Sequence, residues 1–147
     1  MKLSTLMLLL TASFLAAGCG TTPADKDLLQ GAWYLVAEEE DGKATPIDQI
    51  NAKSNKLIFQ GEKYDLMMRK GSIEKGTFSV DSTKTPKTIT LSPKEGIGDG
   101  GSREGIYDLQ ENVLKVCIAE LNKERPTAFA TKLNSGHQMQ NYKRVPK

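Results

Sequence analysis

Polar and apolar residues alternate along most of the chain after about residue 30, with a period of two and no sustained helical period. Trp33, Leu35 and Ala37 share one face of the first alternating segment, and Leu57 and Phe59 share one face of the next. Such alternation predicts half-buried strands, and the intervening Gly, Asn and Pro residues predict turns. The pattern predicts eight strands, over residues 31–39, 56–60, 63–69, 72–81, 87–92, 102–109, 112–120 and 138–145.

Eight short strands joined mostly by tight turns predict an all-β domain. Sequential hairpins with one apolar face remove their exposed edges by closing, which favours an eight-stranded up-and-down antiparallel barrel. A sandwich of two sheets is the alternative that the pattern leaves open. Residues 46–51 predict a short helical turn between the first two strands, because a proline stands near its start. Residues 122–136 are expected to cover one end or the wall of the barrel.

The first 18 residues have the features of a secretory signal. Lys2 precedes the apolar run 3–15, which is too short to span a bilayer, and small residues follow it up to Cys19. Small residues directly before a cysteine resemble the bacterial lipoprotein signal, in which the thiol is alkylated by diacylglycerol and the chain is cut before it. Ala16 departs from that pattern, which usually has Leu there. A soluble signal cut near Ala17 or Gly18 is the alternative.

This interpretation divides the chain into a signal peptide (1–18), a lipidated N-terminus with a polar tether (19–27) and one barrel domain (28–147). The expected location is the bacterial cell envelope, where the lipid on Cys19 would anchor the protein to a membrane. Gly20 stands where Asp would favour the inner membrane, so we expect the outer membrane, facing the periplasm. Cys117 is then a lone thiol in an apolar strand, and we expect it to be inert.

Charge and motifs exclude several functions. Lys and Arg number 20 against 18 Asp and Glu, a net charge of +2, without the basic excess that a nucleic-acid-binding face needs. Residues 96–101 match G-x-G-x-x-G, but a predicted strand follows where a dinucleotide site needs a helix, so we expect a hairpin loop. The only histidine, His137, has no ligand-spaced neighbour and no serine partner. The acidic run at residues 38–41 is expected to be a solvated loop. We therefore predict no enzyme, no cofactor and no metal.

Gly31 and Trp33 on the first predicted strand, with Arg144 on the last, are similar to the lipocalin signature. Further stretches resemble the lipocalin-like domain family abundant in planctomycete bacteria: residues 29–33, 57–64, 76–78, 86–89, 105–107, 114–117 and 123–127. Most members of that family have no assigned activity. The resemblance implies that Trp33 closes one barrel end and that Arg144 packs across its indole, a cation–π contact.

The inward faces predict a pocket. Aliphatic side chains of medium size dominate them, and an eight-stranded barrel is wide enough either to be filled or to hold one small ligand. We expect a pocket opening away from the Trp33–Arg144 end and lined by Tyr64, Leu66, Phe78 and Tyr107, which binds a small hydrophobic or amphipathic molecule. The alternative is a filled barrel that serves as a structural or protein-interaction module of the envelope, with an unidentified partner.

One polar cluster stands out near the last predicted turn. Glu124 and Arg125 precede Pro126, which forces Arg125 into an extended conformation. The pair either binds an anionic group at the barrel mouth or pins its loop onto the barrel wall.

Overall fold

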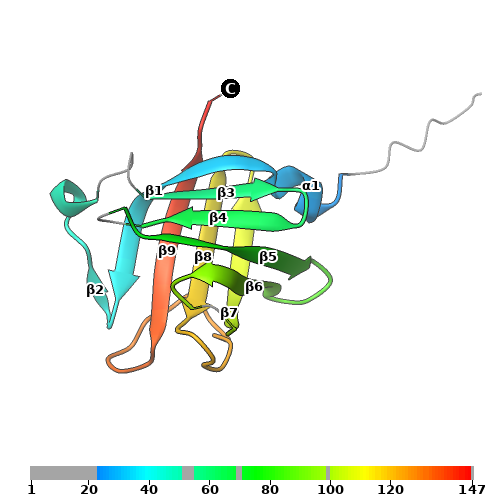
Figure 1. Cartoon of the computed structure of the whole chain (residues 1–147). Helices are drawn as coiled ribbons and strands as arrows, with labels where there is room; N and C mark the ends of the chain where they lie inside the picture. Colours follow the sequence, from blue (N-terminus) through cyan, green and yellow to red (C-terminus); the bar gives the residue numbers. More distant parts are fainter. Residues whose placement is uncertain (1–22, 51–54, 69–70, 99, 147) are drawn as a thin grey trace, which may run out of the picture.

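The computed structural model describes residues 23–50, 55–68, 71–98 and 100–146 (Figure 1). One helix, one 3-10 turn and nine strands follow in order: α1 (Asp25–Leu29), β1 (Gly31–Glu40), β2 (Lys43–Ala44), η1 (Ile47–Gln49), β3 (Lys56–Gln60), β4 (Lys63–Met67), β5 (Ile73–Asp81), β6 (Lys87–Gly96), β7 (Arg103–Gln110), β8 (Val113–Ala119) and β9 (His137–Arg144). Each of the eight predicted strands has its counterpart. The two-residue strand β2 is an addition.

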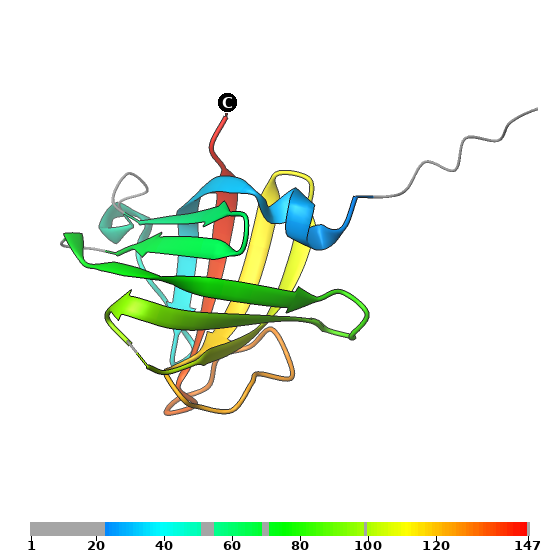
Figure 2. The same cartoon turned by 45° about the vertical axis from the view of Figure 1, so that its right-hand side comes forward.

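The strands form a closed antiparallel barrel. The sheet order is β2-β1-β3-β4-β5-β6-β7-β8-β9, and β1 also pairs with β9, so that eight strands close the ring and β2 extends β1 (Figures 1 and 2). The predicted all-β, up-and-down barrel is therefore confirmed, and the two-sheet sandwich is excluded. Closure suits this chain because every long strand then has both edges paired.

Closure depends on β1, which changes partner along its length. Residues Gly31 to Tyr34 pair with β3, while β9 pairs from Trp33 to Glu40, with a bulge between Leu35 and Ala37. The bulge adds a residue and so changes the side-chain phase. Glu38 lines the interior beyond it, where strict alternation from Trp33 and Leu35 would have pointed Glu39 inward. The acidic run is thus the end of a strand and not the expected solvated loop.

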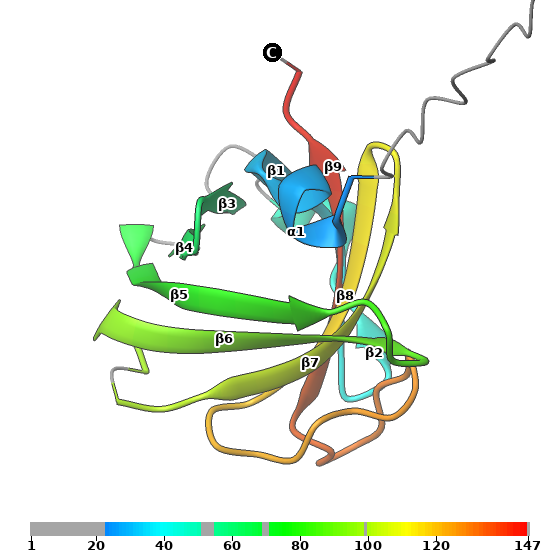
Figure 3. The same ribbon diagram turned by 90° about the vertical axis from the view of Figure 1, so that its right-hand side faces the viewer.

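α1 closes one end of the barrel. Figure 3, which looks at this end, shows the helix surrounded by strands, and Leu29 has no exposed surface. The core beneath it is made of large side chains: Trp33, Phe59, Tyr64, Phe78, Tyr107 and Leu114. Phe59 and Phe78 lie 4.5 Å apart between ring centroids. This half of the barrel is filled.

The helix corrects the expected boundary of the polar tether. Asp25 and Asp27 belong to α1, not to the tether that the composition predicted as far as residue 27. The Asp25 carboxylate accepts hydrogen bonds from Lys87 Nζ at 2.8 Å and from the Tyr107 hydroxyl at 2.7 Å. Local composition does not predict this role of Asp25, because its two partners lie 62 and 82 residues away in the sequence.

These contacts make the closed end sensitive to acid. Partial burial alone would raise the pKa of Asp25, but the hydrogen bonds from Lys87 and Tyr107 outweigh it and hold that pKa below the ordinary 3.8. A carboxyl with a lowered folded-state pKa stabilises the fold above its unfolded pKa, and the contribution is lost as pH falls through the folded value. We expect Asp25→Asn to lower the urea midpoint at pH 7 more than at pH 3. Equal losses at the two pH values would contradict the assignment.

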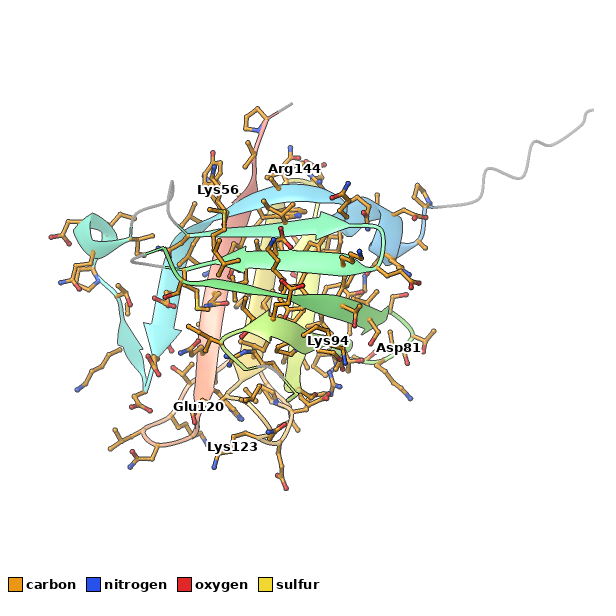
Figure 4. The ribbon with its side chains drawn as sticks, in the orientation of Figure 1. Lys56, Asp81, Lys94, Glu120, Lys123 and Arg144 are labelled. Atoms are coloured by element: carbon orange, nitrogen blue, oxygen red, sulfur yellow. The ribbon has the colours of Figure 1, made fainter. Side chains whose placement is uncertain are left out.

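The β8–β9 connection lies against the outer wall of the barrel. Arg125 donates hydrogen bonds to the Ile89 and Gly105 carbonyls and pairs with Glu104. Cys117 is fully buried beneath the same connection, where burial raises the pKa of its thiol. In Figure 4, Glu120 and Lys123 at the start of this connection lie at the opposite end of the molecule from Arg144. The hydrogen bonds of Arg125 and the burial of Cys117 show that the connection covers the wall, one of the two placements expected for it.

Candidate functional site

A cavity of about 300 Å³ occupies the other half of the barrel interior. Its apolar lining comes from strands around the whole ring: Leu35, Leu57, Leu66, Ile89, Leu91, Val116 and Ile118. These residues alternate with outward-facing neighbours, so the period-two pattern of the sequence gives the cavity its apolar wall. These seven side chains are aliphatic. Among the described residues that line the cavity Tyr142 is the one aromatic residue, whereas Trp33, Phe59, Tyr64, Phe78 and Tyr107 are core residues outside the lining.

The cavity lies away from α1. Its lining includes Glu38 near the end of β1, Gln138 and Gln140 near the start of β9, and Leu66 near the end of β4. Trp33 and Arg144 stand at the reverse ends of β1 and β9 and face each other in the register. Because β1 and β9 run antiparallel, the cavity and the Trp33–Arg144 pair occupy opposite ends of the barrel.

One side of the cavity is polar. The Tyr142 hydroxyl donates to Gln140 Oε1 at 2.9 Å, and Gln140 Nε2 donates to Glu38 Oε1 at 3.3 Å. Tyr142 is 2% exposed, and burial raises the pKa of its hydroxyl, which therefore stays a donor. This row runs from the packed core toward the open end along the β1–β9 seam.

A buried ion pair stands on the other side of the interior. Glu74 on β5 has no exposed side-chain surface and pairs with Arg103 on β7, with Arg103 Nη2 3.1 Å from Glu74 Oε2. The Tyr64 hydroxyl donates to Glu74 Oε1 at 2.8 Å. Burial, together with this hydrogen bond to a carboxylate, raises the pKa of Tyr64. Of these three side chains, Arg103 is the one that lines the cavity.

The structure separates the four residues predicted to bind a ligand. Leu66 lines the cavity, but Tyr64, Phe78 and Tyr107 belong to the filled half and are at most 5% exposed. Tyr64 and Tyr107 have their hydroxyls committed to Glu74 and Asp25. These three side chains share the inward face with Leu66, but the pattern does not tell at what depth along the barrel each one lies.

The structure brings Trp33 and Arg144 together. The Arg144 guanidinium carbon lies 4.1 Å from the centroid of the Trp33 ring. Arg144 also donates to the Leu28 and Gln30 carbonyls, and Trp33 Nε1 donates to the Leu29 carbonyl at 2.8 Å. The pair therefore holds three successive carbonyls at the end of α1, which would otherwise lack partners.

Glu124 and Arg125 are not among the described residues that line the cavity. The hydrogen bonds of Arg125 tie it to the barrel wall, so of the two alternatives for Glu124 and Arg125 the geometry favours the structural one. Cys19 lies outside the described residues. Within the described ranges, no three His, Cys, Asp or Glu side chains gather where they could hold a metal ion. None of the described helices is long and apolar enough to cross a membrane.

Comparison with models of protein families, with curated proteins and with solved structures finds no match to this chain. The cavity and its lining are therefore the features from which a function can be inferred.

Proposed function

We propose that this protein is a lipid-anchored lipoprotein of the bacterial envelope whose lipocalin-like barrel binds a small hydrophobic or amphipathic molecule. The observation that carries the proposal is the cavity of about 300 Å³ with an aliphatic wall and a polar side. Ligand sites are usually preformed, mostly apolar cavities with a few placed polar groups, and their volumes begin near about 300 Å³. No catalytic role is proposed for any residue.

The cavity volume sets the size of the guest. A volume of about 300 Å³ lies at the small end of the range for ligand sites. A single short chain or one ring fits this description. The alternative, a filled barrel that acts through its outer surface, is disfavoured because a cavity of about 300 Å³ remains in the interior.

Leu66→Trp is expected to abolish ligand uptake without unfolding the barrel. The larger ring occupies the cavity, where Leu66 is only partly buried and has space beside it. Calorimetric titration with octan-1-ol should give micromolar binding to the wild-type domain and at least tenfold weaker binding to the variant. Leu28→Trp is the matched control, because Leu28 belongs to α1, is 41% exposed and does not line the cavity. If octan-1-ol fails to bind the wild type, or binds both variants equally, the ligand-binding proposal falls.

Cys19→Ser tests the anchor. The serine hydroxyl cannot take the thioether-linked diacylglycerol, so the variant is expected to leave the membrane fraction or to remain as an uncut precursor. Mass spectrometry of the wild-type mature protein should find lipid on an N-terminal Cys19. An unmodified, soluble wild-type protein that starts at another residue would contradict this part of the proposal.

A further inference from the structure

The polar groups of the cavity specify the head of the guest. The two that bear most on it are Arg103, which lines the cavity from β7, and Asn55, which lines it just before β3. Their side chains come from different parts of the barrel interior, which is otherwise mainly apolar. Buried polar groups in proteins nearly always have hydrogen-bond partners, so those that lack them indicate where a partner is to be bound.

Arg103 has donor capacity left over. Its Nε and Nη2 groups donate to Glu74 at 3.1–3.3 Å, and no hydrogen bond among the described residues uses Nη1. The Arg103 side chain is 19% exposed, whereas Glu74 is fully enclosed. Glu74 therefore holds the Arg103 guanidinium in place. The N–H groups of Arg103 that do not bind Glu74 are available to a guest.

Asn55 supplies a second unused donor, and this donor is buried. The residue is 7% exposed, and its Nδ2 has no hydrogen-bond partner in the described part of the chain. Leaving a buried amide without a partner costs about 1–3 kcal/mol. An acceptor on the guest would supply the missing hydrogen bond, which explains why a destabilising amide is found at this position.

Charge decides between the possible head groups. Two donors select a head that accepts hydrogen bonds, which argues against an ammonium group. Glu38 also lines the cavity, but both of its carboxylate oxygens already accept hydrogen bonds, from Gln140 and Thr45. A carboxylate is an acceptor too, but the charge of Arg103 is already balanced by the buried Glu74, so a second anion would enter without a counter-charge. An uncharged carbonyl adds no charge, and its oxygen has two lone pairs, one for each of the two donors that line the cavity.

We infer that the cavity selects an uncharged, short-chain amphiphile whose head presents a carbonyl oxygen, as in a ketone, ester or amide, to Arg103 and Asn55. The alkyl chain lies among the aliphatic residues, including Leu57, Ile89 and Val116. This inference rests on the proposed function, because it names the class of molecule that the same cavity takes.

The test compares three probes with the same eight-carbon chain: octan-2-one, octanoate and octylammonium. Titrated calorimetrically into the mature domain at pH 7.5, octan-2-one is expected to bind at least tenfold tighter than either charged probe. Tighter binding of octanoate would overturn the uncharged class, and tighter binding of octylammonium would overturn the donor assignment. If octan-1-ol binds and none of these three probes does, this inference fails and the proposed function stands. If octan-1-ol does not bind either, the proposed function itself fails.

Two variants locate the head. Asn55→Leu should weaken octan-2-one binding at least fivefold while raising the melting temperature, since it removes an unsatisfied amide. The triple variant Tyr64→Phe, Glu74→Leu, Arg103→Met replaces the buried polar group as a unit and should lower the affinity by about tenfold or more. Lys94→Met, on the exposed outer face of β6, is the control and should bind as the wild type does. If octan-2-one binds both test variants as tightly as it binds the wild type, this inference is overturned and the proposed function stands.

Discussion

Trp33→Ala should destabilise the domain by about 3–5 kcal/mol, the range for large aromatic truncations in cores. Trp33 has no exposed surface, and its indole lies between the Leu29 carbonyl and the Arg144 guanidinium. Removing the ring leaves a cavity beneath α1 and deprives Arg144 of the surface on which it packs. Urea unfolding followed by far-ultraviolet circular dichroism measures the loss.

Arg144→Ala is the companion variant and should cost less, about 1–2 kcal/mol, because the core stays filled. The variant loses the contact with the indole and two hydrogen bonds to the end of α1. Proteolysis in the native state should then cut near α1 faster than in the wild type. A Trp33→Ala loss below 1 kcal/mol, or a larger loss in Arg144→Ala, would contradict this role of the pair.

Arg103→Met alone should cost about 3–5 kcal/mol, because it leaves the Glu74 carboxylate buried without its counter-charge. Glu74 is fully enclosed, and the Tyr64 hydroxyl would be its one remaining hydrogen-bond partner among the described residues. Little apolar packing is lost, because the methionine side chain is about as long as the aliphatic part of the arginine side chain. The effect is therefore electrostatic, and thermal unfolding of the two proteins at pH 7 measures it.

The triple variant Tyr64→Phe, Glu74→Leu, Arg103→Met separates charge from packing. Replacing a buried ion pair as a unit is often neutral or stabilising, so we expect it to unfold within about 2 kcal/mol of the wild type. A triple variant as unstable as Arg103→Met alone would show that the positions matter for their shape and not for the ion pair.

The alternation of polar and apolar residues predicts most of the fold. The inward phase of β1, β3 and β8 could be predicted from Trp33, Leu57 and Val116, because tight hairpins force successive strands to share one apolar face. The inward positions also include charged residues, which a search for apolar residues alone does not notice. Glu74 shares the face of Phe78, and Arg103 shares the face of Tyr107, so each places a charge on an inward position. Opposite charges on inward faces predict a buried pair.

Other features depend on contacts that local pattern does not contain. The bulge after Leu35 reverses the phase of β1, so Glu38 lines the cavity against the alternation. α1 has five residues, too short for a helical period, and is held by side chains from Trp33 and Arg144. How deep each inward residue lies depends on strand stagger, which explains why Leu66 lines the cavity and Tyr64 does not.

Methyl nuclear magnetic resonance of the mature domain, titrated with octan-1-ol, shows whether the barrel interior is open to a guest at the end away from α1. We expect shifts in the methyl groups of Leu57, Ile89 and Val116, which line the cavity, and none in Leu29 or Leu114, which do not. Shifts confined to exposed residues such as Leu133, or no shifts at millimolar octan-1-ol, would contradict it.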